Sequence, residues 1–458
     1  MNSSEDWQPS RLMPVSGLNA ADEQERRGTS ALLAVMQAVS EYGKAVLQYF
    51  NAPNGNIETF IEVPFELGGK KYRPDGLIRI RRGAKTWVAL VEVKTLRNKL
   101  DDAQVSAYLE IAKQEGFDAV ITISNELASV GGAHPLTLDR RTTKKVELHH
   151  ISWSLLHHDA LVLFKSGAIK DKQRNWILGE FIRYLEYPKS GAIDFDDMGQ
   201  SWVTVREAAI ASTLRANDTS TLDVVDHYSQ LMRYVAMNLS SKLGVKVNRV
   251  LKRADRENPR DFLSRMAYEL ARSGRMTGQI DIPNAAAPIE ITADLRAGRI
   301  FCSLILGAPL SGRPATKVSW LLRQLRESPR DLLLSVNGPR ARDVGPTLRL
   351  EKAIERPDLL LAGVNFEIRS FSISIGGTAG SKRGQGKNSF VDSVISLVDS
   401  FYGSTVQNLK AFVPPAPKVI ANETVPSRPD EGRAAEGEAD AKTNVDSLDE
   451  ETSTPVED

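Results

Sequence analysis

The first third of the sequence predicts an α/β fold in the order helix, three strands, helix and strand, written αβββαβ. Three observations predict it. Apolar residues recur at steps of three and four over residues 32–47, which is helical spacing. They alternate at steps of two over residues 57–65, which is strand spacing. Residues 117–124 form a mostly apolar run, typical of a strand buried on both faces.

Local signals place the first elements of this fold. Thr29 or Ser30 is expected to cap a helix that runs to about Tyr49. A strand is expected over residues 57–67. Gly68-Gly69 then supplies the turn into the strand of the central hairpin.

The central hairpin is predicted to bring ionisable residues together. Gly83-Ala84 lies between two strand-like runs, and a turn centred there pairs Asp75 with Glu92. Directly opposed residues have Cβ atoms about 5 Å apart. Because strand side chains alternate between faces, Lys94 shares the face of Glu92. A turn with an odd number of residues would shift this pairing by one.

Two carboxylates and a lysine on one strand face indicate metal-assisted chemistry. Like charges placed opposite each other repel, and a divalent cation between them would remove that repulsion. Mg²⁺ prefers oxygen ligands and keeps several waters, which leaves positions for a scissile phosphate and an attacking water. Mn²⁺ is the expected substitute. Lys94 would orient that water or stabilise charge on the phosphoryl oxygens. The alternative is a solvated hairpin whose charges merely alternate.

The motif formed by Pro74-Asp75 and Glu92-Val93-Lys94, in this order of elements, resembles the PD-(D/E)XK nuclease superfamily over residues 28–125. The resemblance implies a restriction-endonuclease-like core. It also implies that Asp75 and Glu92 bind the metal ion and that Lys94 is the catalytic lysine. The resemblance covers less than a third of the chain.

The helix expected over residues 100–115 carries Gln104 and Tyr108, a Gln-x-x-x-Tyr pattern similar to that of the RecB-like branch of the superfamily. The resemblance implies that these residues position the substrate or the lysine. Tyr108 also falls in the apolar stripe of this helix, so a core aromatic is the alternative. Some relatives add an acidic residue from the first helix. Glu41 is the candidate here, although it lies opposite the apolar stripe, as a solvated residue would.

Basic residues are dense around the hairpin, where they would attract phosphates. Arg73, Arg97 and Lys99 are the expected substrate contacts, with a solvated basic rim as the alternative. The whole chain has a net charge of +1. Residues 413–458 hold 12 acidic and 4 basic residues. The preceding body is therefore basic, which suits a polyanionic partner.

Composition also divides the chain into segments. Residues 1–27 are polar and are expected to form a flexible arm before a nuclease-like domain over 28–151. Helical spacing over residues 152–244 predicts a helical connector. An α+β domain of unassigned role is expected over residues 245–412. The acidic tail at 413–458 is expected to be disordered.

Other signals concern the setting of the protein. The single cysteine, Cys302, cannot form an intramolecular disulfide and is expected to be buried. No run approaches the roughly 20 apolar residues of a membrane span. The first residues lack the features of a signal peptide, so a cytoplasmic protein is expected. Zinc is not expected, because no cysteine lies near the clustered histidines, which are His149, His150, His157 and His158.

Together these features predict a Mg²⁺-dependent nuclease that hydrolyses phosphodiester bonds, with DNA expected ahead of RNA. The α+β domain would select the substrate or a partner, and it or the acidic tail could bind another protein. Cutting both strands of a duplex needs two sites, which a homodimer would supply. The alternative is a nucleic-acid-binding or regulatory protein that is built on a nuclease fold and performs no hydrolysis.

Overall fold

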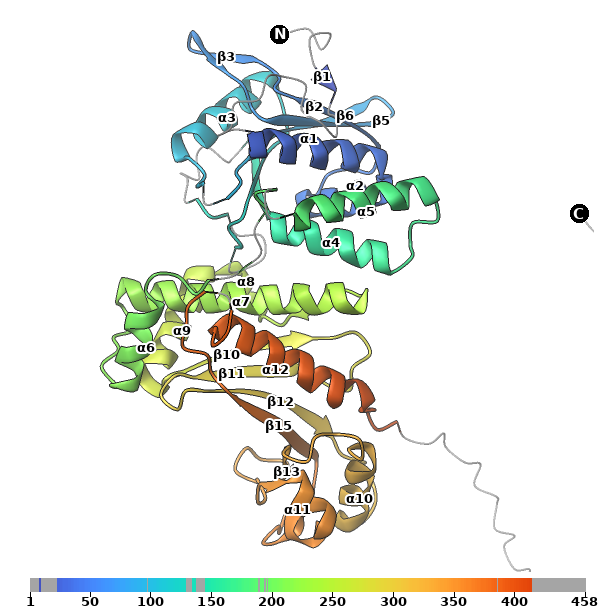
Figure 1. Cartoon of the computed structure of the whole chain (residues 1–458), viewed down its shortest axis with the longest axis vertical. Coiled ribbons are helices and arrows are strands. Elements are labelled where there is room, and N and C mark those ends of the chain that lie inside the picture. Colours follow the sequence, from blue (N-terminus) through green and yellow to red (C-terminus); the bar gives the residue numbers. More distant parts are fainter. Residues whose placement is uncertain are drawn as a thin grey trace, which may run out of the picture. The chain divides into compact units, whose positions relative to one another are not determined.

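The described part of the chain folds as a mixed α/β protein with two large sheets and one small hairpin (Figure 1). The computed structural model describes residues 8–9, 23–96, 98–128, 134–136, 145–187, 190–192, 195, 197–384 and 386–413. The acidic tail beyond Val413 and most of the expected arm at 1–27 therefore lie outside the described residues.

The first sheet is mixed. Strands β1, β2, β5 and β6 pair antiparallel, whereas β6, β7 and β8 run parallel. A parallel pair needs a crossover, and α3 (Asp102–Glu115) lies in the connection from β6 to β7. In spatial order the strands are β1 (Gln8–Pro9), β2 (Asn56–Ile61), β5 (Gly76–Arg82), β6 (Lys85–Val93), β7 (Ala119–Ser124) and β8 (Glu147–Ser152).

Alternate residues of these strands enter separate cores on the two faces of the sheet. Leu90 belongs to the core shared with α3, and Val91 belongs to the core shared with α1 (Glu23–Ala38). Glu92 continues the alternation and therefore belongs to the face covered by α3.

The first helix begins earlier than expected. α1 starts at Glu23, and the Thr29 hydroxyl donates to the Glu25 carbonyl at 2.7 Å. The predicted cap at Thr29 or Ser30 is therefore wrong, because both residues are buried inside the helix.

The same helix ends before Tyr49. It breaks at Val39, and the chain continues as α2 (Ser40–Leu47) and the 3₁₀ turn η2 (Gln48–Phe50). A Cβ atom at Gly43 would lie 2.1 Å from the Met36 carbonyl oxygen. Only glycine permits this close approach of α2 to the end of α1.

The strand expected over residues 57–67 is divided in two. β2 ends before Glu62, which has a left-handed backbone with a φ of 52°. Beyond it β3 (Phe65–Leu67) and β4 (Lys70–Tyr72) form a separate hairpin. Its turn is at Gly68-Gly69, with positive φ angles that glycine adopts without strain, so the predicted turn is present. It leads into β4 and not into the strand of the central hairpin, so that part of the prediction is wrong.

The β5–β6 hairpin has the predicted register. Gly76 faces Val91, which is the pairing that a two-residue turn at Gly83-Ala84 requires. The ladder ends at this pair, and Asp75 lies in a bend directly before β5. The register that the predicted pairing of Asp75 with Glu92 assumed is therefore confirmed.

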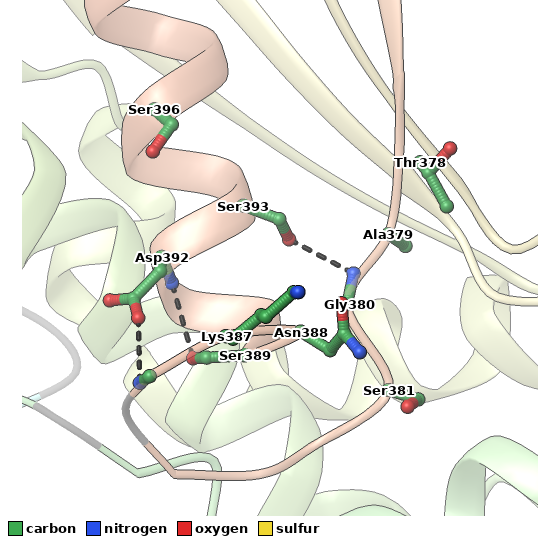
Figure 2. Close-up of a pocket in the computed structure, with 11 residues that line it drawn as sticks. Thr378, Ala379, Gly380, Ser381, Lys387, Asn388, Ser389, Asp392, Ser393 and Ser396 are labelled. Atoms are coloured by element: carbon green, nitrogen blue, oxygen red, sulfur yellow. Dashed lines mark hydrogen bonds between the residues drawn. The ribbon is translucent and has the colours of Figure 1, made fainter.

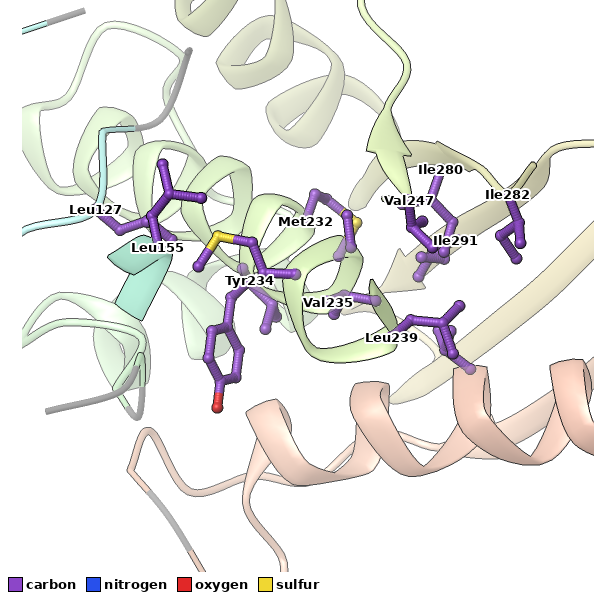
Figure 3. Close-up of a cluster of buried hydrophobic side chains, with 14 of the residues drawn as sticks. Leu127, Leu155, Met232, Tyr234, Val235, Leu239, Val247, Ile280, Ile282 and Ile291 are labelled. Atoms are coloured by element: carbon purple, nitrogen blue, oxygen red, sulfur yellow. The ribbon is translucent and has the colours of Figure 1, made fainter. Parts of the chain in front are cut away.

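Helix α7 packs between the elements that precede it and the second sheet (Figure 3). Its Met232 and Val235 belong to one buried apolar cluster with Leu155 of α4 and with Ile280 and Ile291 of the second sheet. The helices of this region are α4 (Trp153–Lys165), α5 (Lys172–Glu186), α6 (Trp202–Ile210) and α7 (Thr219–Leu243).

The second sheet is antiparallel, and α7 and α12 contact one of its faces. The predicted hairpin across Ala297-Gly298 is present, and Cys302 is buried as predicted. In spatial order the strands are β14 (Leu348–Arg349), β13 (Leu333–Asn337), β15 (Ser370–Thr378), β12 (Arg299–Gly307), β11 (Ile289–Asp294), β10 (Arg275–Asp281) and β9 (Asn248–Arg249).

The remaining helices follow α7 in the second half of the chain. None of the helices in the described part of the chain is long and apolar enough to cross a membrane. The helices are α8 (Arg253–Glu257), α9 (Pro259–Ser273), α10 (Pro314–Gln324), α11 (Leu350–Glu355), η3 (Pro357–Leu361), α12 (Phe390–Ser404) and η4 (Val406–Asn408).

Two histidines form a polar network with Thr122 of β7. The Thr122 hydroxyl lies 2.8 Å from His134 Nε2 and 3.0 Å from His150 Nδ1. His150 Nε2 lies 2.9 Å from the Glu126 carbonyl oxygen. Burial is the main cause that lowers the pKa of both imidazoles to about 4. Both rings are therefore neutral in the folded protein at pH 7.

This network predicts a loss of stability in mild acid. Below pH 6.5 the two histidines become protonated in the unfolded chain. In the folded protein they stay neutral until the pH approaches their pKa of about 4. The free energy of unfolding should therefore decrease as the pH falls through that window. Urea unfolding at several pH values should show a smaller decrease for the His134→Gln/His150→Gln variant than for the wild type. An equal decrease in the free energy of unfolding for the variant and the wild type would contradict the lowered pKa values of His134 and His150.

Candidate active site

The carboxyl end of β6 gathers the three residues expected from the sequence motif. Asp75 Oδ2 accepts a hydrogen bond of 2.8 Å from the Val93 N–H. Lys94 Nζ donates to Glu92 Oε1 at 2.6 Å. Glu92 is only 1% exposed, whereas Asp75 and Lys94 are partly buried. The three residues therefore form a charged cluster in which Glu92 is buried and Asp75 and Lys94 are partly accessible to solvent.

The backbone of Lys94 is fixed from two sides. Its N–H donates to the Ile123 carbonyl of β7 at 2.7 Å. Its carbonyl accepts a hydrogen bond of 3.0 Å from the indole N–H of Trp153, at the start of α4. Trp153 is fully buried, so it acts as a rigid support for the lysine. No local pattern indicates this contact, which joins residues 59 positions apart.

Glu25 of α1 is an acidic neighbour that sequence reasoning missed. Its Oε2 lies 3.7 Å from Lys94 Nζ. Its Oε1 accepts hydrogen bonds from Asn98 Nδ2 at 2.8 Å and from the Thr95 N–H at 3.4 Å. Glu25 thus holds both the lysine and the loop after β6. Extending the buried stripe of the first helix by one turn before Thr29 would have found it.

The expectation that Glu41 adds an acidic side chain to the site is wrong. Glu41 lies on α2, the separate helix after the break at Val39. Its Oε1 lies 3.3 Å from Arg174 Nη1 of α5, on the protein surface. The acidic residue that the first helix supplies to the cluster is Glu25.

Gln104 and Tyr108 lie beside the cluster on α3. Asp101 caps this helix by accepting from the Gln104 N–H at 3.0 Å. Gln104 Nε2 donates to the Tyr108 hydroxyl at 3.0 Å, and that hydroxyl donates to the Arg73 carbonyl at 3.5 Å. Burial raises the pKa of Tyr108, and the charge of Glu92 raises it further. The tyrosine ring is thus a core residue, while its hydroxyl faces the cluster.

The expected basic contacts are only partly located. The Arg73 side chain is exposed. Lys99 lines a hollow of about 460 Å³ together with Glu126, Asp226 and His227. Arg97 lies outside the described residues.

The electrostatics of the cluster favour a bound cation. Burial raises the pKa of Asp75 well above its usual value, and the neighbouring Glu92 raises it further. Burial also raises the pKa of Glu92, although Lys94 opposes this effect. Burial lowers the pKa of Lys94, but the surrounding carboxylates outweigh it and the net pKa is raised. Lys94 is therefore protonated at neutral pH, and the site disfavours the ionised form of both carboxyl groups.

The donor set of Asp75 and Glu92 fits a divalent ion. Glu92 Oε2 is buried and has no hydrogen-bond partner within the described structure. Over the same residues, no group of three or more His, Cys, Asp or Glu side chains is arranged to hold a metal ion. Mg²⁺ commonly binds through one or two carboxylates, with water and phosphate oxygens completing its shell. A site with the two carboxylates of Asp75 and Glu92 is consistent with this coordination preference of Mg²⁺.

A second hollow, of about 580 Å³, lies where the glycine-rich loop after β15 enters α12 (Figure 2). Ser389 Oγ accepts from the Asp392 N–H at 3.2 Å, and Asp392 Oδ2 accepts from the Gly386 N–H at 2.8 Å. These bonds occupy backbone donors that an anionic ligand would need. The hollow is lined by both Lys387 and Asp392, so its charges offset each other.

Comparison of the chain with protein-family models, with curated proteins and with solved structures gives no match.

The raised pKa of Asp75 predicts that its neutralisation stabilises the protein. When the pKa of a carboxyl group is higher in the folded than in the unfolded protein, its ionisation lowers the free energy of unfolding as the pH rises between the two pKa values. Asp75→Asn should therefore raise the thermal midpoint at pH 7 in EDTA by about 1–3 °C. The gain should vanish in acid, where both side chains are neutral.

Asp118→Asn is the matched control, because the exposed Asp118 also accepts a strand N–H, that of Val88, at 2.8 Å. It should not raise the midpoint. A fall of the midpoint in Asp75→Asn would show that the Asp75 charge stabilises the fold.

Proposed function

We propose that the protein is a metal-dependent nuclease that hydrolyses phosphodiester bonds in nucleic acid, with DNA as the expected substrate ahead of RNA. The observation that carries the proposal is the cluster of Asp75, Glu92 and Lys94, in which two carboxyl groups with raised pKa share a buried site with one ammonium. Such an arrangement costs stability, and a structural role does not account for it.

The order of elements around the cluster supports a restriction-endonuclease-like core as the finer description of the fold. α1, β2, β5, β6, α3 and β7 follow one another as helix, three strands, helix and strand. The inserted hairpin of β3 and β4 does not alter the pairing of β2 with β5. The candidate residues lie where β6 ends, beside the parallel strand β7.

Each side chain has a role that follows from its contacts. Asp75 and Glu92 would hold Mg²⁺, which supplies a Lewis acid for the phosphate and a more acidic bound water. Lys94, positive at neutral pH, would stabilise negative charge that develops on the phosphoryl oxygens. Trp153 and Glu25 keep Lys94 in place. Gln104 and the Tyr108 hydroxyl offer polar contacts at the margin of the same site.

A cleavage assay tests the proposal. End-labelled DNA and RNA, single- and double-stranded, should be cut in Mg²⁺ or Mn²⁺ and not in EDTA. Asp75→Ala and Lys94→Ala should each lower the rate by roughly 10²–10³-fold, because each removes charge stabilisation that the transition state needs. Glu41→Gln, which alters a surface ion pair with Arg174, should retain the wild-type rate.

Two results would count against hydrolysis at this site. One is cleavage that survives both Asp75→Ala and Lys94→Ala. The other is nucleic-acid binding that persists in EDTA while neither metal ion supports cleavage. That second result would favour a binding protein on a nuclease fold.

Metal binding should depend on pH in a defined direction. Mg²⁺ requires ionised carboxylates, and the pKa values of Asp75 and Glu92 are raised. The affinity for Mn²⁺ or Mg²⁺, measured by titration calorimetry, should therefore fall as the pH decreases from neutral. Glu92→Gln should abolish the binding heat, whereas Glu41→Gln should leave it unchanged. A pH-independent affinity would place the ion elsewhere.

A further inference from the structure

A hollow of about 450 Å³ in the second half of the chain is lined by three arginines. Arg323 lies near the end of α10, and Arg326 and Arg330 follow it in the turn toward β13. All three side chains are exposed. The rest of the lining is Ser319, Leu322, Glu327 and Ile354.

The local backbone explains why the three arginines converge. Arg323 lies in the last turn of α10, while Arg326 and Arg330 lie in the turn after that helix, and all three side chains line the same hollow. The Arg330 carbonyl accepts a hydrogen bond of 3.1 Å from the Glu351 N–H, which fixes Arg330 beside α11. α11 then contributes Ile354 to the hollow.

These arginines have no carboxylate partner within the described structure. Other exposed arginines of the same half of the chain do: Arg272 pairs with Glu269 and Arg356 with Asp358, at 2.9 and 2.8 Å. The Arg323 Nε–H donates only to the Ser319 carbonyl, at 3.3 Å. With Glu327 as the single acidic lining residue, the hollow has an excess of positive charge.

We infer that this hollow, hereafter the arginine hollow, binds phosphate groups of the nucleic-acid strand, an inference that rests on the proposed nuclease function. Guanidinium groups donate two parallel hydrogen bonds to a phosphate, and three of them can follow successive phosphates. Leu322 and Ile354 offer an apolar surface for a sugar or base. The second half of the chain thus holds the substrate independently of the metal cluster.

The test measures binding without cleavage. Fluorescence anisotropy in EDTA would follow labelled DNA and RNA, single- and double-stranded, bound to the full chain at several salt concentrations. The variant Arg323→Gln/Arg326→Gln/Arg330→Gln should bind about tenfold more weakly, and the slope of log K against log salt should fall by about two units. Its thermal midpoint should match that of the wild type, because the three side chains are exposed.

The matched control removes the same charge from the same region. Arg340→Gln/Arg342→Gln/Arg349→Gln changes three exposed arginines outside the arginine hollow. This control should lose less than about threefold in affinity. Equal losses in both triple variants would show a general charge effect and overturn the inference, as would wild-type binding by the first variant.

The inference and the proposed function can fail separately. Loss of binding in the arginine-hollow variant, in a protein that cleaves nothing, would uphold the phosphate site without the nuclease. Wild-type binding by that variant, in a protein whose cleavage depends on Lys94, would remove the arginine hollow and leave the nuclease intact.

Discussion

The register of the β5–β6 hairpin is the constraint on which the candidate site depends. A two-residue turn at Gly83-Ala84 sets the pairing of Gly76 with Val91. Beyond the end of the ladder, the Val93 N–H donates to Asp75 Oδ2 at 2.8 Å and holds Asp75 beside the end of β6, next to Glu92. A shift of one residue would move Glu92 and Lys94 to the opposite face of the sheet.

The charged cluster is held in place by the surrounding fold, because burial opposes the ionised form of both its carboxyl groups. Removing a carboxylate from water costs several kcal/mol unless it is paired and hydrogen-bonded. Lys94 pairs with one oxygen of Glu92, while the other is buried without a partner in the described structure. The surrounding apolar residues and the Trp153 hydrogen bond must offset this cost. A cluster supported in this way would suit the proposed binding of a cation and a phosphate.

Helix α7 relates the site to the second half of the chain. It packs against α4, whose first residue, Trp153, supports Lys94, and against the strands of the second sheet. Its Tyr228 hydroxyl donates to the Ile291 carbonyl at 3.0 Å inside the core, which fixes the helix on that sheet. The proposed cation site and the arginine hollow therefore belong to one compact unit.

The sequence by itself determined what depends on local periodicity and turn chemistry. The period of two, with the turn at Gly83-Ala84, predicted that Asp75 would face Glu92, and helical spacing placed Gln104 one turn from Tyr108. Only the tertiary structure decided which distant elements meet. Glu25 was missed because a helix start is weakly encoded, and Trp153 because a contact between distant elements has no local signal. The arginine hollow likewise exists only because α11 packs beside the turn that follows α10.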